Sequence, residues 1–484
     1  MKQKSFYLLL LLATIFTWSC QKEADVFAPV ISGAEVDTVL NIGDKLVLAP
    51  DITNLVGIEY TWLVNGKEVA AGQTDYTFTA TDPGNFVVLF RAGNKGGTGE
   101  QAFKILVEEP IAIALENGLT IPLSQVLDIE PAISGPERDD YQYEWAIGDS
   151  IIGLTATLPF ISVSPGDYTL TLTTTAGKQS ASATFDVKVE DAEYKNNAYT
   201  VLEYCPAPAR GFNWSIIGSA AFWDMTEFPL PYEDFLTKST EMKSQRIGNE
   251  MVVGSWGGYI TFKFDHTVAN VPGQPDLELN ATFSNVDHPT VYVAYDSNKN
   301  GKPDEDEWFE IKGDDYGLED IPDYEITFTY AGTDIESDPL RFYTSFTWKD
   351  NQETPRQDEV VYNNRWNNAL TMFGTISTKG FFPGYHIKDQ TSKEIVLMDG
   401  WESSFSRKGK RISKDLTGKG TVLQKLNIDI ANAVNDNGEP VHLPGVDFVK
   451  ILKSSYPYVR GVDENMTEGR MLLVRDIIDK HLLD

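Results

Sequence analysis

Tyr60-Thr61-Trp62-Leu63-Val64-Asn65-Gly66, followed by Asp82-Pro83-Gly84-Asn85-Phe86-Val87-Val88, decides the fold, because this pattern occurs twice. The second copy is Tyr143-Glu144-Trp145-Ala146-Ile147-Gly148, followed by Ser164-Pro165-Gly166-Asp167-Tyr168-Thr169-Leu170. The two tryptophans lie 83 positions apart, and the glycines of the two Pro-Gly pairs lie 82 apart. A period this constant indicates an internal repeat. Apolar residues alternate in each copy, which predicts short strands with one buried face.

Each repeat is expected to be a small β-sandwich. A tryptophan on a central strand, followed in the next strands by Pro-Gly and an aromatic residue, is typical of two sheets packed face to face. Both copies resemble immunoglobulin-like domains of the PKD type, and this resemblance implies a spacer or stalk. We assign PKD-like domains to residues 26–108 and 109–191, neither of which contains a histidine.

The segment 199–484 follows a polar joint at 192–198 and holds seven of the ten tryptophans. Strand-like alternation recurs at 259–264, 290–295 and 324–330, between long loops rich in Gly, Asn, Asp and Pro. We therefore predict one large, jelly-roll-like β-sandwich with long loops that binds the ligand, and an all-β fold class for the whole chain.

A short helix is predicted at the end of this sandwich, over residues 467–482. Met471, Val474, Ile478 and Leu482 would form one apolar stripe on it.

The first nineteen residues are typical of a secretory signal peptide. Lys2 and Lys4 precede an apolar run of 11 residues, Phe6–Phe16. A membrane-spanning helix needs about 20 residues, so the run is too short to be one. Thr17-Trp18-Ser19-Cys20 then resembles a lipobox, which implies that Cys20 carries the lipid of a bacterial lipoprotein. The alternative is an ordinary signal peptide with an incidental cysteine.

Residues 20–25 are interpreted as the lipid anchor and tether. Gln21-Lys22-Glu23-Ala24-Asp25 resembles the acidic export tag that sends lipoproteins to the cell surface in a Gram-negative phylum rich in them. The resemblance implies a protein of the outer membrane that is lipid-anchored and faces the cell exterior. The other cysteine, Cys205, is expected to be a buried thiol.

The formal net charge of −31 excludes two classes of partner. Such a surface repels nucleic acid, and it also repels anionic lipid headgroups. Contact with a membrane is therefore expected to come from the N-terminal lipid and not from a basic patch.

The loop 296–307 matches the twelve-residue calcium-loop pattern at every specified position. Oxygen ligands alternate along it, and Gly301 permits the sharp turn around the ion. The backbone carbonyl would serve at the lysine, and a solvated acidic turn is the alternative interpretation. Hard oxygen donors favour a structural Ca²⁺ over zinc or copper. The expected ligand positions are Asp296, Asn298, Asn300, Lys302, Asp304 and Glu307.

No pattern for catalysis is found, and we expect a binding protein and not an enzyme. The five histidines are not spaced for a zinc pair, and no serine lies in a nucleophile-elbow sequence. Aromatic residues in or beside loop-like stretches instead suggest stacking against sugar rings or a large planar cofactor. The candidate ligand-binding residues are Trp214, Trp223, Trp256, Trp348, Arg365, Trp366 and Trp401.

Parts of the segment 250–450 resemble one family of surface lipoproteins. They are residues 257–265, residues 308–313 with the preceding loop, residues 348–352 and residues 443–450. Some members resemble BtuH-type cobalamin-binding lipoproteins, which implies a cobalamin or other corrinoid ligand and a TonB-dependent transporter as partner. The alternatives are a glycan-binding lipoprotein of a polysaccharide-uptake system and a structural or adhesive surface protein.

Overall fold

The computed structural model describes residues 25–32, 37–205, 207, 232–241, 251–254, 256–284, 289–313, 316–317, 320–335, 342–352, 361–363, 385–389, 394–397, 404–410, 422–454 and 472–482. Regular structure in these residues is almost entirely strand, so the predicted all-β class is confirmed. The described exceptions are the helix α2 (Tyr232–Glu241) and the 3₁₀ turns η3 (Glu305–Glu307) and η5 (Ile430–Asn432). No helix among the described residues is both long and apolar enough to cross a bilayer.

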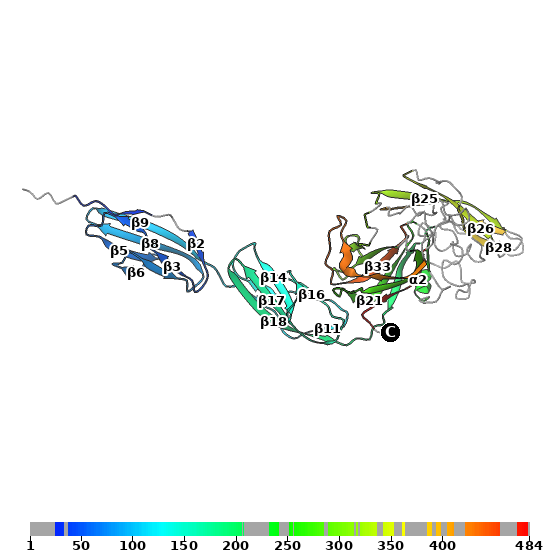
Figure 1. Ribbon diagram of the computed structural model, residues 1–484, viewed down its shortest axis with the longest axis horizontal. Helices are drawn as coiled ribbons and strands as arrows, with labels where there is room; N and C mark the ends of the chain where they lie inside the picture. Colours follow the sequence, from blue (N-terminus) through cyan, green and yellow to red (C-terminus); the bar gives the residue numbers. More distant parts are fainter. Residues whose placement is uncertain are drawn as a thin grey trace, which may run out of the picture. The chain divides into compact units, whose positions relative to one another are not determined.

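The first repeat is a sandwich built on the five-stranded sheet β2-β9-β8-β5-β6, with the pairs β1-β4 and β3-β7 (Figure 1). Trp62 on β5 is fully buried; its ring lies 4.5 Å from that of Phe90, and its Nε1 donates to the Gln73 carbonyl at 3.1 Å. The strands are β1 (Val30–Ser32), β2 (Asp37–Leu40), β3 (Lys45–Leu48), β4 (Asp51–Thr53), β5 (Glu59–Val64), β6 (Lys67–Ala71), β7 (Tyr76–Thr79), β8 (Gly84–Asn94) and β9 (Gly97–Val107).

The second repeat has the same order of strands, β11-β18-β17-β14-β15 with β10-β13 and β12-β16. Trp145 on β14 corresponds to Trp62: it is fully buried, and its Nε1 donates to the Thr155 carbonyl at 3.1 Å. The strands are β10 (Ala112–Ala114), β11 (Leu119–Pro122), β12 (Leu127–Ile129), β13 (Ala132–Ser134), β14 (Gln142–Ile147), β15 (Ser150–Gly153), β16 (Leu158–Phe160), β17 (Gly166–Ala176) and β18 (Gln179–Glu190).

Two compact units divide the chain within this second repeat. One comprises Met1–Gly118, Glu130–Leu158 and Thr169–Asp186; the other comprises Leu119–Ile129, Pro159–Tyr168 and Val187–Asp484. The domain limits assigned from the sequence stay predictions.

The C-terminal region is a large sandwich of two sheets. The six-stranded sheet β19-β21-β33-β23-β24-β32 and the four-stranded sheet β20-β34-β22-β31 share one core, to which Phe262 and Val449 contribute from the first sheet and Leu279 and Val474 from the second. These strands are β19 (Tyr199–Cys205), β20 (Met251–Gly254), β21 (Tyr259–Ala269), β22 (Leu277–Ser284), β23 (Thr290–Ala294), β24 (Trp308–Ile311), β31 (Val422–Ile428), β32 (Ala433–Val434), β33 (Gly445–Leu452) and β34 (Leu472–Asp479).

A third sheet, β27-β26-β25-β30, contributes Tyr324, Phe328 and Trp348 to the same core, and β28 pairs with β29 in a separate two-stranded sheet (Figure 1). The three strands predicted from alternation correspond to β21, β23 and β25. These additional strands are β25 (Tyr324–Ile335), β26 (Phe342–Asp350), β27 (Val361–Asn363), β28 (Tyr385–Asp389), β29 (Glu394–Leu397) and β30 (Ser404–Gly409).

The helix predicted over 467–482 is wrong, because the described part of this segment is strand β34. β34 pairs with β20 on one side and β22 on the other, so it is a central strand. Both faces of β34 are largely buried, including Arg475, Asp476 and Asp479, so its sequence loses the alternation that marks a half-exposed strand. The same residues then also fit a helical stripe.

Candidate functional site

The twelve-residue loop 296–307 curls back on itself between β23 and β24. The Asp296 carboxylate accepts the backbone N–H groups of Asn300 at 2.9 Å and Gly301 at 2.8 Å. Gly301 has a φ of +77°, the left-handed conformation that the motif predicts for it. Lys263 on β21 donates from Nζ to the Gly301 carbonyl at 2.7 Å, which ties the middle of the loop to the sheet.

Three expected ligand side chains meet at one oxygen of Asp304. Its Oδ2 accepts the side-chain amides of Asn298 at 2.6 Å and Asn300 at 2.8 Å. The oxygen and nitrogen of a side-chain amide are nearly isosteric, so a half-turn of each amide replaces these two donors by two acceptors. The turn breaks two bonds, from Asn300 N–H to Asn298 Oδ1 at 3.0 Å and from Lys302 N–H to Asn300 Oδ1 at 2.8 Å.

Glu307 closes the loop from its last position. The side chain is 6% exposed; Oε1 accepts the N–H and hydroxyl of Ser297 at 3.0 and 2.7 Å, and Oε2 accepts the Asp304 N–H at 3.0 Å. Within the described residues, no group of three or more His, Cys, Asp or Glu side chains is gathered as a metal site. The three carboxylates of the loop, those of Asp296, Asp304 and Glu307, are thus not gathered as one metal-holding group, and the calcium site stays a prediction from the twelve-residue pattern.

The outer face of the six-stranded sheet adjoins this loop. The residues of this sheet that point inward, among them Phe262 and Val449, belong to the core. Their neighbours along the strands point the opposite way, onto the outer face. Register places Lys450 between Thr261 and Tyr292, and Tyr292 opposite Glu310. We define the outer face by Glu203, Tyr259, Thr261, Lys263, Tyr292, Trp308, Glu310, Phe448 and Lys450.

Lys450 is held between two aromatic rings on this face. Its Nζ lies 4.4 Å from the centroid of Trp308 and 5.3 Å from that of Tyr259. Burial lowers the pKa of the Lys450 ammonium, against the opposing effects of Glu203 and Cys205. Trp308 follows Glu307 directly in the chain, so the last residue of the loop fixes the start of the strand that carries this ring.

Acidic groups on the same face are held by hydrogen bonds. Burial raises the pKa of Glu310, although Lys410 and Tyr292 lower it. Lys410 contacts Glu310 at 3.3 Å and Asp320 at 2.7 Å. Asp447, which accepts the Asp296 N–H at 2.8 Å, also has its pKa raised by burial. Asp447 thus ties the loop to β33, whereas Glu310 belongs to the outer face.

The two proposed tryptophans that the structure describes, Trp256 and Trp348, do not belong to this face. Trp256 is 1% exposed and packs edge-on against Tyr324 at 4.6 Å. Trp348 is 0% exposed and lies on β26 in the core. Their burial fits core packing, and their proposed role in ligand binding stays a prediction. Cys20, Trp214, Trp223, Arg365, Trp366 and Trp401 lie outside the described residues.

Trp308, Tyr259 and Lys450 were not among the candidates proposed from the sequence. The position of Trp308 next to the loop was the one signal available, whereas the other two residues join it only through strand register.

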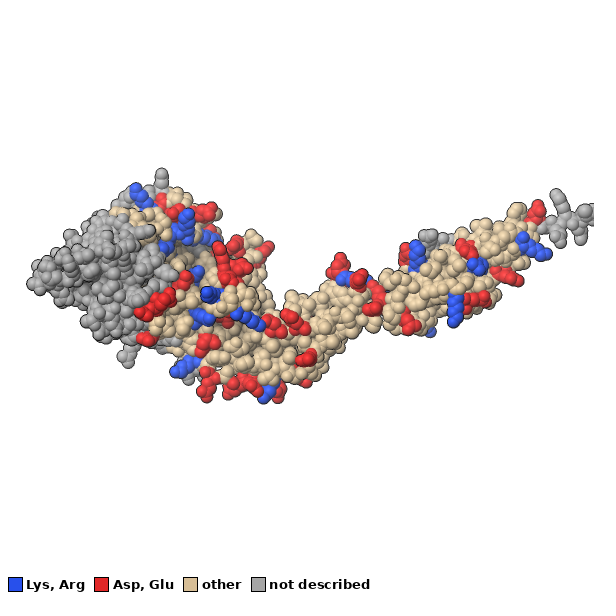
Figure 2. Space-filling model, turned by 180° about the vertical axis from the view of Figure 1, so that it is seen from behind, with Lys and Arg blue, Asp and Glu red and all other residues tan. Residues whose placement is uncertain are grey.

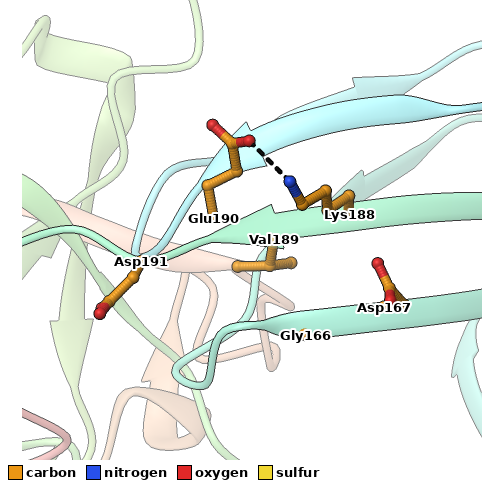
Figure 3. Close-up of a pocket in the computed structure, with 6 residues that line it drawn as sticks. All are labelled: Gly166, Asp167, Lys188, Val189, Glu190 and Asp191. Carbon is orange, nitrogen blue, oxygen red and sulfur yellow. Dashed lines mark hydrogen bonds and ion pairs between the residues drawn. The ribbon is translucent and has the colours of Figure 1, made fainter.

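A separate, open hollow of about 500 Å³ lies at the end of β18 and the start of β17. Figure 3 shows Lys188 paired with Glu190 at 3.0 Å at its rim. These side chains are more than half exposed, and an exposed ion pair of this kind is typical of solvated surface. On the face drawn in Figure 2, acidic side chains are likewise spread over the described surface, with basic ones among them.

Comparison with known proteins identifies the first repeat. The family model for a PKD-like domain matches residues 29–94. The first repeat is thus similar to a PKD-like domain, and the second repeat shares its order of strands. No curated protein matches the chain.

Several solved structures are similar to parts of the chain. An I-band fragment from titin has 19% identity over 38% of this chain and 71% of that chain, with a TM-score of 0.26. The first two immunoglobulin domains of DIP-gamma have 12% identity over 34% of this chain and 99% of theirs, with a TM-score of 0.25. Sidekick-1 immunoglobulin domains have 15% identity over 38% of this chain and 53% of that chain, with a TM-score of 0.25. Scores this low carry no argument about function.

Proposed function

We propose that this chain is an outer-membrane lipoprotein, anchored at Cys20, that captures a nutrient ligand at the cell surface for a TonB-dependent transporter. The best single ligand is cobalamin or another corrinoid. Immunoglobulin-like and PKD-like domains are typically non-catalytic modules, which agrees with a binding role. The repeats would serve as a stalk for the C-terminal sandwich.

The observation that supports ligand capture most directly is the Lys450 ammonium between the rings of Trp308 and Tyr259. The two rings offer apolar faces for stacking, and the ammonium is a hydrogen-bond donor in partly desolvated surroundings. A corrinoid carries a large flat ring, amide groups and a phosphodiester, and each of these has a complementary group on this face.

A bound calcium ion next to the outer face is the second part of the proposal. We propose that the loop 296–307 binds Ca²⁺ through Asp296, Glu307, the side chains that meet at Asp304 and the backbone carbonyl of Lys302. Its role would be structural: the ion would fix Glu307 and therefore the neighbouring Trp308. The support for this site is the match to the twelve-residue pattern, together with the meeting of the Asn298 and Asn300 side chains at Asp304.

A co-elution experiment tests the ligand. The chain from Gln21 onward, produced without its lipid, is mixed with cyanocobalamin and separated by size. The corrin absorbs visible light and should elute with the protein. Trp308→Ala and Lys450→Met should each remove that absorbance, whereas Lys425→Met should retain it, because Lys425 lies on β31 of the other sheet and is exposed.

The two alternative functions predict different results in this assay and in two companion assays. If cyanocobalamin does not co-elute but the protein is retained on immobilised polysaccharide, the glycan-binding alternative is correct. If binding to surfaces or cells persists in a fragment that holds only the two PKD-like repeats, the adhesive alternative is favoured. Binding of cyanocobalamin that survives both face variants would mean that the ligand lies elsewhere.

A further inference from the structure

The first repeat exposes three large apolar side chains at one end. Phe27 is 70% exposed, Leu55 is 60% exposed and Val56 is 69% exposed. Leu55 and Val56 occupy the turn that follows β4, where Gly, Asn, Asp, Ser or Pro is usual. Isolated apolar residues on a surface are ordinary, but three on adjoining segments form a patch that needs a partner.

Hydrogen bonds from one side chain hold the two segments together. Asn94 Nδ2 donates to the carbonyl of Phe27 at 2.9 Å and to that of Val56 at 3.2 Å. Asn54 Nδ2 donates to the Ala28 carbonyl at 2.9 Å. Because β1 pairs with β4 in antiparallel register, the residues before β1 run beside those after β4.

The hairpin turn between β8 and β9 clamps the same segment from another side. A Cβ at Gly96 would lie 2.2 Å from the Val26 carbonyl oxygen and 2.6 Å from the Phe27 carbonyl carbon. The backbones therefore meet at a distance that only glycine permits. We define the apolar tip as Phe27, Leu55 and Val56, and its base is ordered by these contacts.

The apolar tip lies at the end of the repeat that carries the tether. Phe27 is seven residues after Cys20, so an extended tether reaches at most about 25 Å. Asn94 and Gly97 pair at this end of the β8–β9 hairpin, whereas Gly84 pairs with Val107 at the other, from which the chain continues to β10 (Figure 1). An anchored Cys20 therefore holds this end, and not the flank, near the lipid.

We propose that the apolar tip inserts into the lipid surface beside Cys20 and forms a second, protein-made contact with the membrane. This inference rests on the proposed lipid anchor. Amphipathic surfaces bind membranes by burying apolar side chains at the boundary of headgroups and acyl chains. A net charge of −31 leaves apolar insertion, and not attraction to anionic headgroups, as the available mode.

The test uses a tether that does not depend on lipidation. The chain from Gln21 receives an N-terminal hexahistidine tag in place of Cys20 and is bound to phosphatidylcholine vesicles that contain a nickel-chelating lipid. In a Cys205→Ala background, Leu55→Cys is labelled with an environment-sensitive dye. Val39→Cys is the matched control, because Val39 is 53% exposed on β2 and pairs with Leu106 at the far end of the repeat.

The dye at position 55 should shift its emission to shorter wavelength on vesicles, and brominated lipid should quench it at least twofold. The dye at position 39 should do neither, and Phe27→Ser with Val56→Ser should abolish the shift at position 55. Equal responses at the two positions would overturn the proposal. A shift that appears with protein concentration in the absence of vesicles would also overturn it, since the partner would then be a second copy. Failure of the anchor itself is measured separately by fractionation of Cys20→Ser.

Discussion

Replacing Asn300 by Asp should change the stability of the C-terminal sandwich in opposite directions with and without calcium. In the presence of chelator, Asp304 Oδ2 loses the hydrogen bond from Asn300 Nδ2, 2.8 Å away. It faces a second carboxylate in the place of that donor. A hydrogen bond to a charged group contributes about 1.5–3 kcal/mol, and solvent exposure reduces this to about 1–2 kcal/mol. At roughly 2–4 °C per kcal/mol, the midpoint of unfolding should fall by about 2–8 °C.

Calcium should reverse this loss. If the loop binds with a dissociation constant of about 10⁻⁴–10⁻³ M, 100-fold to 10-fold excess calcium stabilises the wild-type fold by about 2.7–1.4 kcal/mol. The variant should gain more, because Asp supplies a ligand oxygen without the half-turn that the amide of Asn300 requires. Asp296→Ala combined with Glu307→Ala should abolish the calcium-dependent shift altogether.

The assay is thermal unfolding of the chain from Gln21, followed by near-ultraviolet circular dichroism in chelator and in millimolar calcium. Asn435→Asp is the matched control, because Asn435 Nδ2 donates to Glu439 at 2.9 Å in a similar polar turn without the twelve-residue pattern. That control should lose stability in chelator and should not recover in calcium. The reasoning is refuted if Asn300→Asp and Asn435→Asp respond alike, or if chelator and calcium give wild-type curves that coincide.

Three further predictions concern the anchor, one buried pair and one repeat. Cys20→Ser should move the protein from the membrane fraction to the soluble fraction of cells, and a variant that stays with the membrane would contradict the lipoprotein assignment. Burial lowers the pKa of His266, but hydrogen bonds to Asp479 and Asp265 outweigh it and raise that pKa overall, so this pairing stabilises the fold below about pH 6.5 and is lost as pH rises through the raised value. His266→Gln should therefore flatten the fall in melting temperature between pH 6 and pH 8. Trp145→Ala should cost about 3–5 kcal/mol in urea unfolding, whereas the exposed Ile151→Ala should change it by less than about 0.5 kcal/mol.

The repeats could be predicted because their signals are local and occur twice. Trp62 and Trp145 each lie in the middle of a half-buried strand, and the positive φ angles of Gly84 and Gly166 explain the glycine that follows each proline. Turn chemistry and alternation agree over the same short windows, so neither copy needs long-range information. The calcium-like loop is local in the same way, since every expected ligand lies within twelve residues.

Strand β34 could not be predicted for the opposite reason. Its polar residues are buried and find partners far away in the chain: Tyr199 donates to Asp476 at 2.7 Å, and Arg475 donates to Thr282. Sequence patterns assign polar residues to the solvent side, and this places them wrongly wherever a distant strand supplies the hydrogen bond. The helical stripe was the nearest local alternative to a strand with two buried faces.

The outer face of the six-stranded sheet depends on the same kind of information. Lys450 meets Trp308 only because β23 lies between β33 and β24 in a particular register, and a slip by one residue would turn Lys450 into the core and Val449 outward. Bulges between Lys263 and Val268 on β21 show that this register is not uniform along the sheet. The chemistry proposed here is therefore a property of pairings between segments more than 100 residues apart, whereas the calcium-like loop beside it is encoded in one short stretch. The loop can be recognised without the sheet, but the sheet determines which aromatic ring the loop positions.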